Sequence, residues 1–312
     1  MNHLIIFSIC IPVHNRERLI GRAIRSCLTQ KGDDFEIIVT DDGSTDRTVA
    51  VIEAIHDPRI RLLRHEGNHG HAAARNTAEK VAAGEWIVVL DSDDELLPGS
   101  LDLIRSVVQT GGSEVKCYEF MCRRDDGKCS PDPPLVDGRI SYEHYLRRIN
   151  KQRRFDPLLC IRRSAAHRTP WYESQFSGSV LHSLDLHREH CCAAVSADVG
   201  LIHTDATNRI SWVRRSPNMA RTVGVELGLE LDLILSRHGT ELQRLAPLTW
   251  RRLMRVRASY YFLQGSRWSG VIQTLRCLQS SPLSAEVWAQ LMIGLASPQM
   301  YARIRGNRPP PT

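Results

Sequence analysis

The sequence lacks an apolar run long enough to cross a membrane. The longest strongly apolar stretch near the start, residues 4–13, falls well short of the roughly 20 residues that a transmembrane helix needs. No lysine or arginine precedes Arg16, so a secretory signal peptide is not expected either. These absences predict a cytoplasmic protein, and residues 4–13 fit a buried first strand better than an anchor.

Zinc-type cysteine spacing is also missing. The chain has 9 cysteines, an odd number, and Cys117, Cys122 and Cys129 stand too far apart for a C-x-x-C pair. Without a leader that would direct the chain to an oxidising compartment, we expect free thiols.

Lysine is absent from the last third of the chain. From Asn208 onward there are 15 arginines and five acidic residues, a formal net charge of +10 against +6 for the whole chain. A basic region of this kind suits an anionic surface such as the inner face of a membrane, although a solvated, arginine-rich helical face has the same composition.

The first hundred residues alternate between short apolar runs and helical patterns. Strands are predicted over four runs, and the segments between them have helical periodicity: the strands are residues 4–13, 35–40, 60–64 and 86–90. This alternation predicts an α/β fold with a mostly parallel, Rossmann-like sheet covered on both faces.

The pattern changes after Ser216-Pro217, where only helical periodicity remains. We therefore expect two parts, an α/β domain over residues 1–215 and a helical region over 216–312.

Polar side chains follow three of the four predicted strands. Pro12-Val13-His14-Asn15 ends the first, Asp41-Asp42-Gly43-Ser44 ends the second, and Asp91-Ser92-Asp93-Asp94 ends the fourth. In open α/β sheets, ligands bind at the carboxyl ends of the strands. Each cluster alone also suits an ordinary turn or helix cap.

The run Asp91-Ser92-Asp93-Asp94 concentrates negative charge. Neighbouring carboxylates repel one another unless a cation lies between them. Oxygen ligands suit a hard divalent ion, so the sequence predicts a Mg²⁺ or Mn²⁺ site that also binds substrate phosphates.

Together these motifs resemble a known family. Ile-Pro-Val-His-Asn-Arg, Val-Thr-Asp-Asp-Gly-Ser, Ala-Ala-Ala-Arg-Asn and Val-Val-Leu-Asp-Ser-Asp-Asp follow one another over residues 5–100. Their order and spacing resemble the nucleotide-binding half of family 2 glycosyltransferases, which have the GT-A fold and invert the anomeric centre. The resemblance implies a nucleotide-sugar donor, in particular a UDP-sugar, and a metal-dependent hexosyl or N-acetylhexosaminyl transfer.

The resemblance also implies roles for residues. A pocket for the base and ribose, with contacts to the diphosphate, is implied for Pro12, Val13, His14, Asn15, Asp41, Asp42, Arg75, Asp91 and Ser92. Asp93 resembles the direct metal ligand, and Asp91 resembles the first aspartate of the Asp-x-Asp motif, which reaches the metal or the ribose. Asp94 is a weaker candidate that also suits a helix cap. His14 stands where the family usually has tyrosine.

The general base is where the chain departs from the family. Relatives place a Glu-Asp pair before a helix that resembles Leu184-Asp185-Leu186-His187-Arg188, whereas this chain has His182-Ser183. Three alternatives remain: Asp185 is the base, His182 is the base, or the base is absent. We favour Asp185.

The acceptor side is less well marked. Trp171 and Tyr172 lie in the segment that forms the acceptor side in relatives, although both equally suit a core. Arg209 lies in a stretch that resembles a loop closing over the donor. We expect a saccharide or lipid-linked acceptor for polysaccharide synthesis, possible peripheral contact with the membrane, and no nucleic-acid partner.

Other functions are weaker. A sugar-phosphate nucleotidyltransferase would have a glycine-rich, basic loop after the first strand, and a dinucleotide-dependent dehydrogenase would have G-x-G-x-x-G there; the chain has neither. A nucleotide-sugar-binding protein without turnover remains the main alternative because of His182-Ser183.

Overall fold

The structure is a computed structural model, and it describes residues 5–152, 156–173, 179–205, 219–280 and 285–296. The chain forms two compact units. The first comprises residues 1–145 and 151–206, and the second comprises residues 146–150 and 207–312. The boundary expected at residue 215 lies outside the described residues, so its position stays a prediction.

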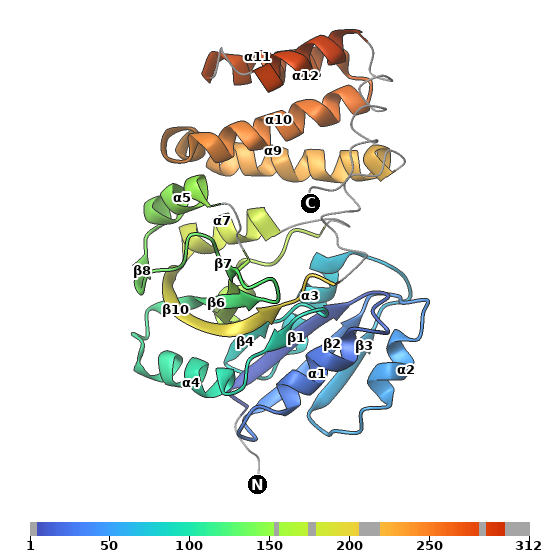
Figure 1. Ribbon diagram of the computed structural model, residues 1–312, viewed down its shortest axis with the longest axis vertical. Helices are drawn as coiled ribbons and strands as arrows, with labels where there is room; N and C mark the ends of the chain where they lie inside the picture. Colours follow the sequence, from blue (N-terminus) through green and yellow to red (C-terminus); the bar gives the residue numbers. More distant parts are fainter. Residues whose placement is uncertain (1–4, 153–155, 174–178, 206–218, 281–284, 297–312) are drawn as a thin grey trace. The chain divides into compact units, whose positions relative to one another are not determined.

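The first unit is built on one large sheet (Figure 1). Its strands are β1 Phe7–Val13, β2 Phe35–Asp41, β3 Ile60–Arg64, β4 Trp86–Val89, β5 Glu95–Leu96, β6 Val115–Arg124, β7 Cys129–Ser130, β8 Gly138–Ile140, β9 Leu158–Arg162 and β10 Cys191–Ile202. The order across the sheet is β3-β2-β1-β4-β9-β6-β10-β5, with β7 paired to β6 and β8 paired to β10.

The first four strands are parallel. β1 lies between β2 and β4, and Val13 pairs with Asp41 in the register. Parallel strands end at the same edge, so the segments after β1, β2 and β4 meet there. The predicted α/β fold is confirmed. The sheet becomes mixed at β9, which runs antiparallel to both β4 and β6.

All seven residues of β1 are buried, and β2 is buried at all but one position. The continuous burial reflects a sheet that is covered on both faces, which is why these strands read as apolar runs without alternation. The described helices of this unit are α1 Ile20–Leu28, α2 Thr48–Glu53, α3 His71–Val81, α4 Ser100–Thr110, α6 Arg163–Ala166 and α7 Ser179–Glu189, and α5 Tyr142–Lys151 is divided between the two units.

Helix α3 brings polar groups close to the sheet. It begins after Gly70, whose φ of 97° favours glycine, and it buries four alanines against β1 and β2. Small side chains allow a close approach of helix and sheet. Arg75, Asn76 and Glu79 are buried on the same helix, so its polar groups face the interior of the unit.

The second unit is helical, as predicted. It contains α9 Met219–Leu245, α10 Pro247–Leu263, α11 Arg267–Ser280 and α12 Ala285–Ala296. Pro247 stands in the first turn of α10, and Asn150 Oδ1 accepts the N–H of Leu248 at 2.7 Å. This cap explains why residues 146–150 belong to the second unit. Among the described helices, none combines the length and apolar character of a membrane span.

Candidate nucleotide and metal site

Asp41 is the last residue of β2, and only one of its two carboxylate oxygens has a hydrogen-bond partner among the described residues. Its Oδ2 accepts the backbone N–H of Ser44 at 3.2 Å. Its Oδ1 is buried and has no hydrogen-bond partner among the described residues, and the residue is 2% exposed. An unsatisfied buried carboxylate oxygen is costly, so this geometry suits a ligand that donates an N–H.

Asp42, the next residue, is fully engaged by the protein. Its Oδ1 accepts from His65 Nδ1 at 2.7 Å and from the backbone N–H of His69 at 2.9 Å, and its Oδ2 accepts the N–H of Gly70 at 2.7 Å. These bonds fix the loop that leads into α3. Asp42 therefore contributes to the site by holding this loop, and a direct contact with a nucleotide stays a prediction.

The loops after β1 and β2 are bonded to each other. His14 Nδ1 lies 2.8 Å from the carbonyl of Asp42, and His14 Nε2 lies 3.0 Å from Asn15 Nδ2. Since a carbonyl only accepts, Nδ1 carries the proton and Nε2 accepts. Asn15 has a φ of 51° and donates its N–H to Ser44 Oγ at 2.9 Å. Pro12 and Val13 are buried directly before them.

Arg75 and His71 lie one turn apart on α3 and both face Asp91. Arg75 Nη2 donates to Asp91 Oδ1 at 2.6 Å, and His71 Nε2 lies 3.4 Å from the same oxygen. Partial burial raises the pKa of Asp91, but the charge of Arg75 and the contact with His71 outweigh it and hold the pKa well below its usual range. Burial, followed by repulsion from Arg75, lowers the pKa of His71. Asp91 is therefore a carboxylate at neutral pH.

Three carboxylates converge after β4. Oxygens of Asp91, Asp93 and Asp94 lie within 4.8 Å of one another, and all three residues are partly exposed. A donor set of carboxylate oxygens fits a hard divalent cation such as Mg²⁺ or Mn²⁺. Ser92 is buried between them in the sequence. The four residues thus form an open, acidic loop at the edge where β1 and β2 also end.

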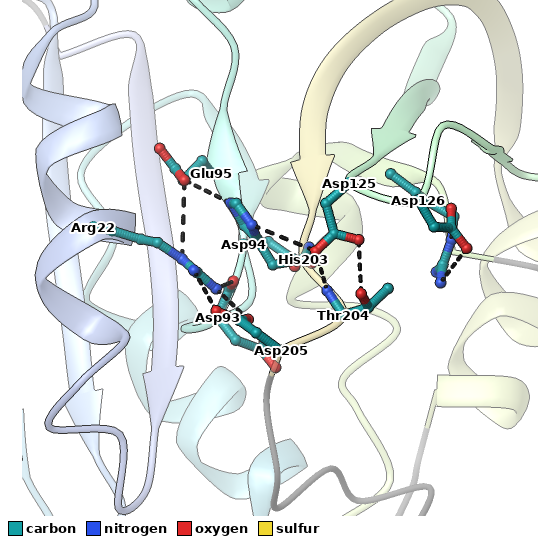
Figure 2. Close-up of polar contacts among 10 residues, drawn as sticks. Arg22, Asp93, Asp94, Glu95, Asp125, Asp126, His203, Thr204 and Asp205 are labelled. Carbon is teal, nitrogen blue, oxygen red and sulfur yellow. Dashed lines mark hydrogen bonds and ion pairs between the residues drawn. The ribbon is translucent and has the colours of Figure 1, made fainter. Parts of the chain in front are cut away.

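The residues after β10 border this loop, a contact that no sequence pattern predicts (Figure 2). The backbone N–H of His203 donates to Asp94 Oδ1 at 3.1 Å, and the ring Nε2 of His203 lies 2.6 Å from Glu95 Oε1. Thr204 donates its N–H and hydroxyl to the two oxygens of Asp125 at 2.7 and 2.8 Å. His203 is 109 positions from Asp94 and Thr204 is 79 positions from Asp125, so no local pattern links them.

Trp171 connects Arg75, which bonds the acidic loop, to α7, the helix that carries the two candidate bases. The guanidinium carbon of Arg75 lies 4.2 Å from the Trp171 ring centroid, and the His182 ring stacks on Trp171 at 3.7 Å. Burial, and then repulsion from Arg75, lowers the pKa of His182 to about 3. His182 is therefore neutral and enclosed. Asp185 lies one turn further along α7, is partly exposed, and acts electrostatically on His182.

The structure thus brings together the residues after β1, β2 and β4 with Arg75, as the strand order predicts. Trp171, which suited either an acceptor surface or a core, is buried. Arg209 lies outside the described residues. His71 is not among the predicted site residues, although its spacing of four residues from Arg75 in a predicted helix is a signal that identifies it.

Comparison with known proteins agrees with this geometry. A solved structure of S. aureus TarS residues 1–349 in complex with UDP-GlcNAc superposes with a TM-score of 0.64, 18% identity, and coverage of 97% of this chain and 88% of that chain. At this identity the likeness shows the fold, the GT-A type.

Curated relatives are similar over about a third of the chain. The succinoglycan biosynthesis protein ExoO of Rhizobium meliloti is 40% identical over 105 residues, which cover 34% of this chain and 30% of that protein. The Escherichia coli protein WfgD, named as a UDP-Glc:alpha-D-GlcNAc-diphosphoundecaprenol beta-1,3-glucosyltransferase, is 42% identical over 96 residues, which cover 31% of this chain and 38% of that protein. The aligned part is thus well under half of either relative.

The family model for glycosyl transferase family 2 matches residues 8–168, which include all but the first residue of β1, every strand from β2 to β9 and the whole acidic loop. This match spans more than half of the chain. The protein therefore belongs to glycosyl transferase family 2.

Proposed function

We propose that the protein transfers a sugar from a UDP-sugar to a hydroxyl group of a saccharide or lipid-linked acceptor, with inversion, in the synthesis of a cell-surface polysaccharide or glycoconjugate. The observation that carries the proposal is the pairing of two features at one edge of the sheet. The buried, unpartnered Oδ1 of Asp41 suits the N–H of a uracil ring, and the acidic loop suits a metal-bound diphosphate. The names of ExoO and WfgD support this reaction class.

The roles follow from the contacts. The base and ribose lie along the ends of β1 and β2, against Pro12, Val13, His14 and Asn15, with Asp41 as acceptor. Asp42 fixes the loop before α3. Arg75 holds Asp91 as a carboxylate, and Asp91 with Ser92 borders the ribose and diphosphate.

A divalent cation, Mn²⁺ or Mg²⁺, fits Asp93, with Asp91 as its neighbour. When bound, such an ion offsets the charge that develops on the diphosphate leaving group. Asp93 would supply the direct ligand, as the resemblance to the family implies, and Asp91, whose Oδ1 accepts from Arg75, would lie beside the ion.

The remaining step is removal of the proton from the acceptor hydroxyl. Asp185 is the proposed base, because it is partly exposed and lies on the helix that Trp171 links to Arg75. As the proton moves to its carboxylate, the acceptor oxygen attacks the anomeric carbon and the bond to the diphosphate breaks. His182, with a pKa of about 3, is a weak base.

The alternative is a protein that binds the nucleotide-sugar without turnover. The enclosed His182, at a position where relatives have a Glu-Asp pair, is the observation that favours it. Turnover distinguishes the two, because both predict donor binding.

We also propose that the second unit contacts anionic lipid, which would place the protein at the cytoplasmic face of a membrane. On α11, Trp268, Ile272 and Leu275 share one face and are 74%, 50% and 45% exposed. Arg267 and Arg276 are exposed beside them. Apolar side chains next to arginines suit the headgroup region of an anionic bilayer.

Vesicle sedimentation tests this contact. Binding to vesicles with phosphatidylglycerol, but not to pure phosphatidylcholine, is expected, with a loss in the Trp268→Ser/Ile272→Ser double variant. Equal recovery in the supernatant with both lipids would exclude the membrane contact.

The central experiment is a thermal-shift titration with UDP, with and without Mn²⁺. A ligand that binds only the folded state raises the melting temperature. UDP with Mn²⁺ should stabilise the wild type, and Asp93→Ala should lose the metal-dependent gain. Asp102→Ala, which removes an exposed carboxylate on α4, is the matched control and should respond like the wild type. No shift with UDP or any other nucleoside diphosphate would overturn the proposal.

A further inference from the structure

Arg22 reaches from α1 to the acidic loop and to the end of β10 (Figure 2). Its Nη1 donates to Asp205 Oδ2 at 2.8 Å, and its Nη2 donates to Asp205 Oδ1 at 2.9 Å. The same Nη2 donates to the backbone carbonyl of Asp93 at 2.7 Å. Glu95 Oε1 lies 3.9 Å from the Arg22 Nε. One guanidinium on α1 thus contacts two segments that are distant in the sequence, the one around Asp93 and Glu95 and the one at Asp205.

The hydrogen bonds to Asp205 orient the Arg22 guanidinium toward Asp93. A bidentate carboxylate fixes the plane of a guanidinium, because the two parallel hydrogen bonds allow little rotation. With Asp205 holding that plane, the second N–H of Nη2 points at a fixed place, which is the carbonyl of Asp93. Asp205 thereby acts on Asp93 through Arg22.

Other hydrogen bonds also hold the acidic loop. The N–H of Asp94 bonds to the carbonyl of Asp91 at 3.1 Å, and His203 bonds to the Asp94 side chain. The end of β10 therefore holds the loop at two points, at Asp94 through His203 and at Asp93 through Asp205 and Arg22. The second contact is made directly to the backbone of the proposed metal ligand.

We propose that Arg22 is a positioning residue for metal-dependent donor binding, and that it acts with Asp205 as one unit. The proposal rests on the proposed function, because it assumes that Asp93 binds the metal. Metal ligands have to be held to within a few tenths of an ångström of the coordination distance. By fixing the backbone carbonyl of Asp93, Arg22 restricts the positions that the Asp93 carboxylate can reach. Arg22 itself contacts neither the metal nor the nucleotide.

A merely structural ion pair makes a different prediction. Partly exposed ion pairs contribute little to stability and have no selective effect on one ligand. Arg105 provides the comparison, because it also bonds two carboxylates, Asp34 and Asp102, and its side chain is 19% exposed against 24% for Arg22. It lies on α4 and bonds no residue of the acidic loop in the described structure.

The test is calorimetric titration of UDP into the full chain, with Mn²⁺ and without metal. We expect Arg22→Gln to weaken UDP binding about tenfold with Mn²⁺, the scale of one lost charge-assisted hydrogen bond, and to leave metal-free binding unchanged. Asp205→Asn should do the same, and the double variant should be no weaker than either single one, because both remove the same contact. Arg22→Lys should recover part of the loss, and Arg105→Gln should bind like the wild type.

Several results would overturn the proposal. Metal-dependent affinity of Arg22→Gln within about twofold of wild type, additive losses in the double variant, or equal losses with and without metal would each exclude the positioning role. So would an equal loss in Arg105→Gln. If the wild type binds UDP equally with and without Mn²⁺, the metal site of the proposed function is excluded, and the positioning role is excluded with it. The two failures are therefore distinguishable.

Discussion

The indole Nε1 of Trp171 donates a hydrogen bond of 2.8 Å to Oε1 of Glu79 inside the first unit. Asn76, on the same helix as Glu79, bonds both the N–H and the carbonyl of Trp171 at 2.9 Å. The segment after α6 is thereby tied to α3 through side chains on successive turns. Because α3 also carries Arg75, this contact positions the guanidinium that faces Asp91.

Glu79 gives the protein a dependence on pH. Burial raises the pKa of Glu79 to about 7, and the Trp171 hydrogen bond and the charge of Arg75 offset only part of this effect. The folded state keeps a proton that the unfolded state releases near its usual pKa of about 4.3. The stability associated with this proton is therefore fully present below about pH 4.3 and is lost as the pH rises through about 7.

Glu79→Gln should remove this loss, because the amide oxygen still accepts from Trp171 and carries no charge. We expect little change in the free energy of unfolding at pH 4 and a gain of about 3 kcal/mol at pH 8, measured by urea denaturation. Glu53→Gln, at an exposed position of α2, is the control and should show no such difference. Equal effects of Glu79→Gln at both pH values would mean that Glu79 is ionised in the folded protein throughout.

Asp41→Asn tests the nucleotide end of the site. We expect UDP binding to weaken about tenfold both with and without Mn²⁺, because the lost acceptor faces the base and not the metal. The folded protein without ligand should keep its stability, since the amide oxygen still accepts from Ser44. Calorimetric titration and thermal melts measure the two effects, and Asp33→Asn on the exposed loop before β2 is the control. Loss restricted to the Mn²⁺ condition would place Asp41 at the metal instead.

Asp185→Asn and His182→Gln separate the two base candidates. Removal of a general base lowers the rate about 10²–10⁴-fold. We therefore expect Asp185→Asn to lower the rate of UDP formation from the donor by that factor, while UDP still binds. His182→Gln should retain turnover within about tenfold, because a histidine with a pKa of about 3 abstracts a proton poorly. The reverse ranking would make His182 the base. Wild type that binds a donor and never releases UDP would favour the binding protein.

Much of this site follows from the sequence because its parts lie at strand ends. The strand Ile60–Arg64 has the bounds that its apolar run predicts, and the strands before Asp41 and Asp91 lie parallel, as their alternation with helices predicts. Local patterns determine strand and helix, and parallel order then brings the ends together. Local patterns and parallel strand order are therefore sufficient to predict that the acidic loop lies beside the ends of β1 and β2.

Other features depend on contacts between distant segments. Arg22 and Asp205 are 183 positions apart, and neither has neighbours that mark a partner. The antiparallel direction of β9 leaves no trace in its own apolar sequence. His182 suited a helix surface or a base from its local pattern, and only the stacking on Trp171 shows that it is enclosed. In each case the deciding information lies in another part of the chain.

Gly43 offers a test of how the nucleotide loop is packed. Its φ is +69°, and a Cβ there would lie 2.5 Å from the backbone carbon of Gly67. Close packing of these two loops supports the Asp42 contacts to His69 and Gly70. Gly43→Ala should lower the free energy of unfolding by about 2–4 kcal/mol, the sum of backbone strain and steric overlap, and should weaken UDP binding.

Gly127→Ala isolates the overlap from the strain. Gly127 has a similar φ of +76°, but a Cβ there would meet nothing within 4 Å. Its alanine variant should therefore lose only the backbone component, about 1 kcal/mol, and bind UDP like the wild type. If the two variants lose equal stability in urea denaturation, the contact between the Gly43 and Gly67 loops contributes nothing. If Gly43→Ala loses stability but retains UDP affinity, the donor site tolerates displacement of the loop after β2, and Asp41 does not require this packing to accept from the nucleotide.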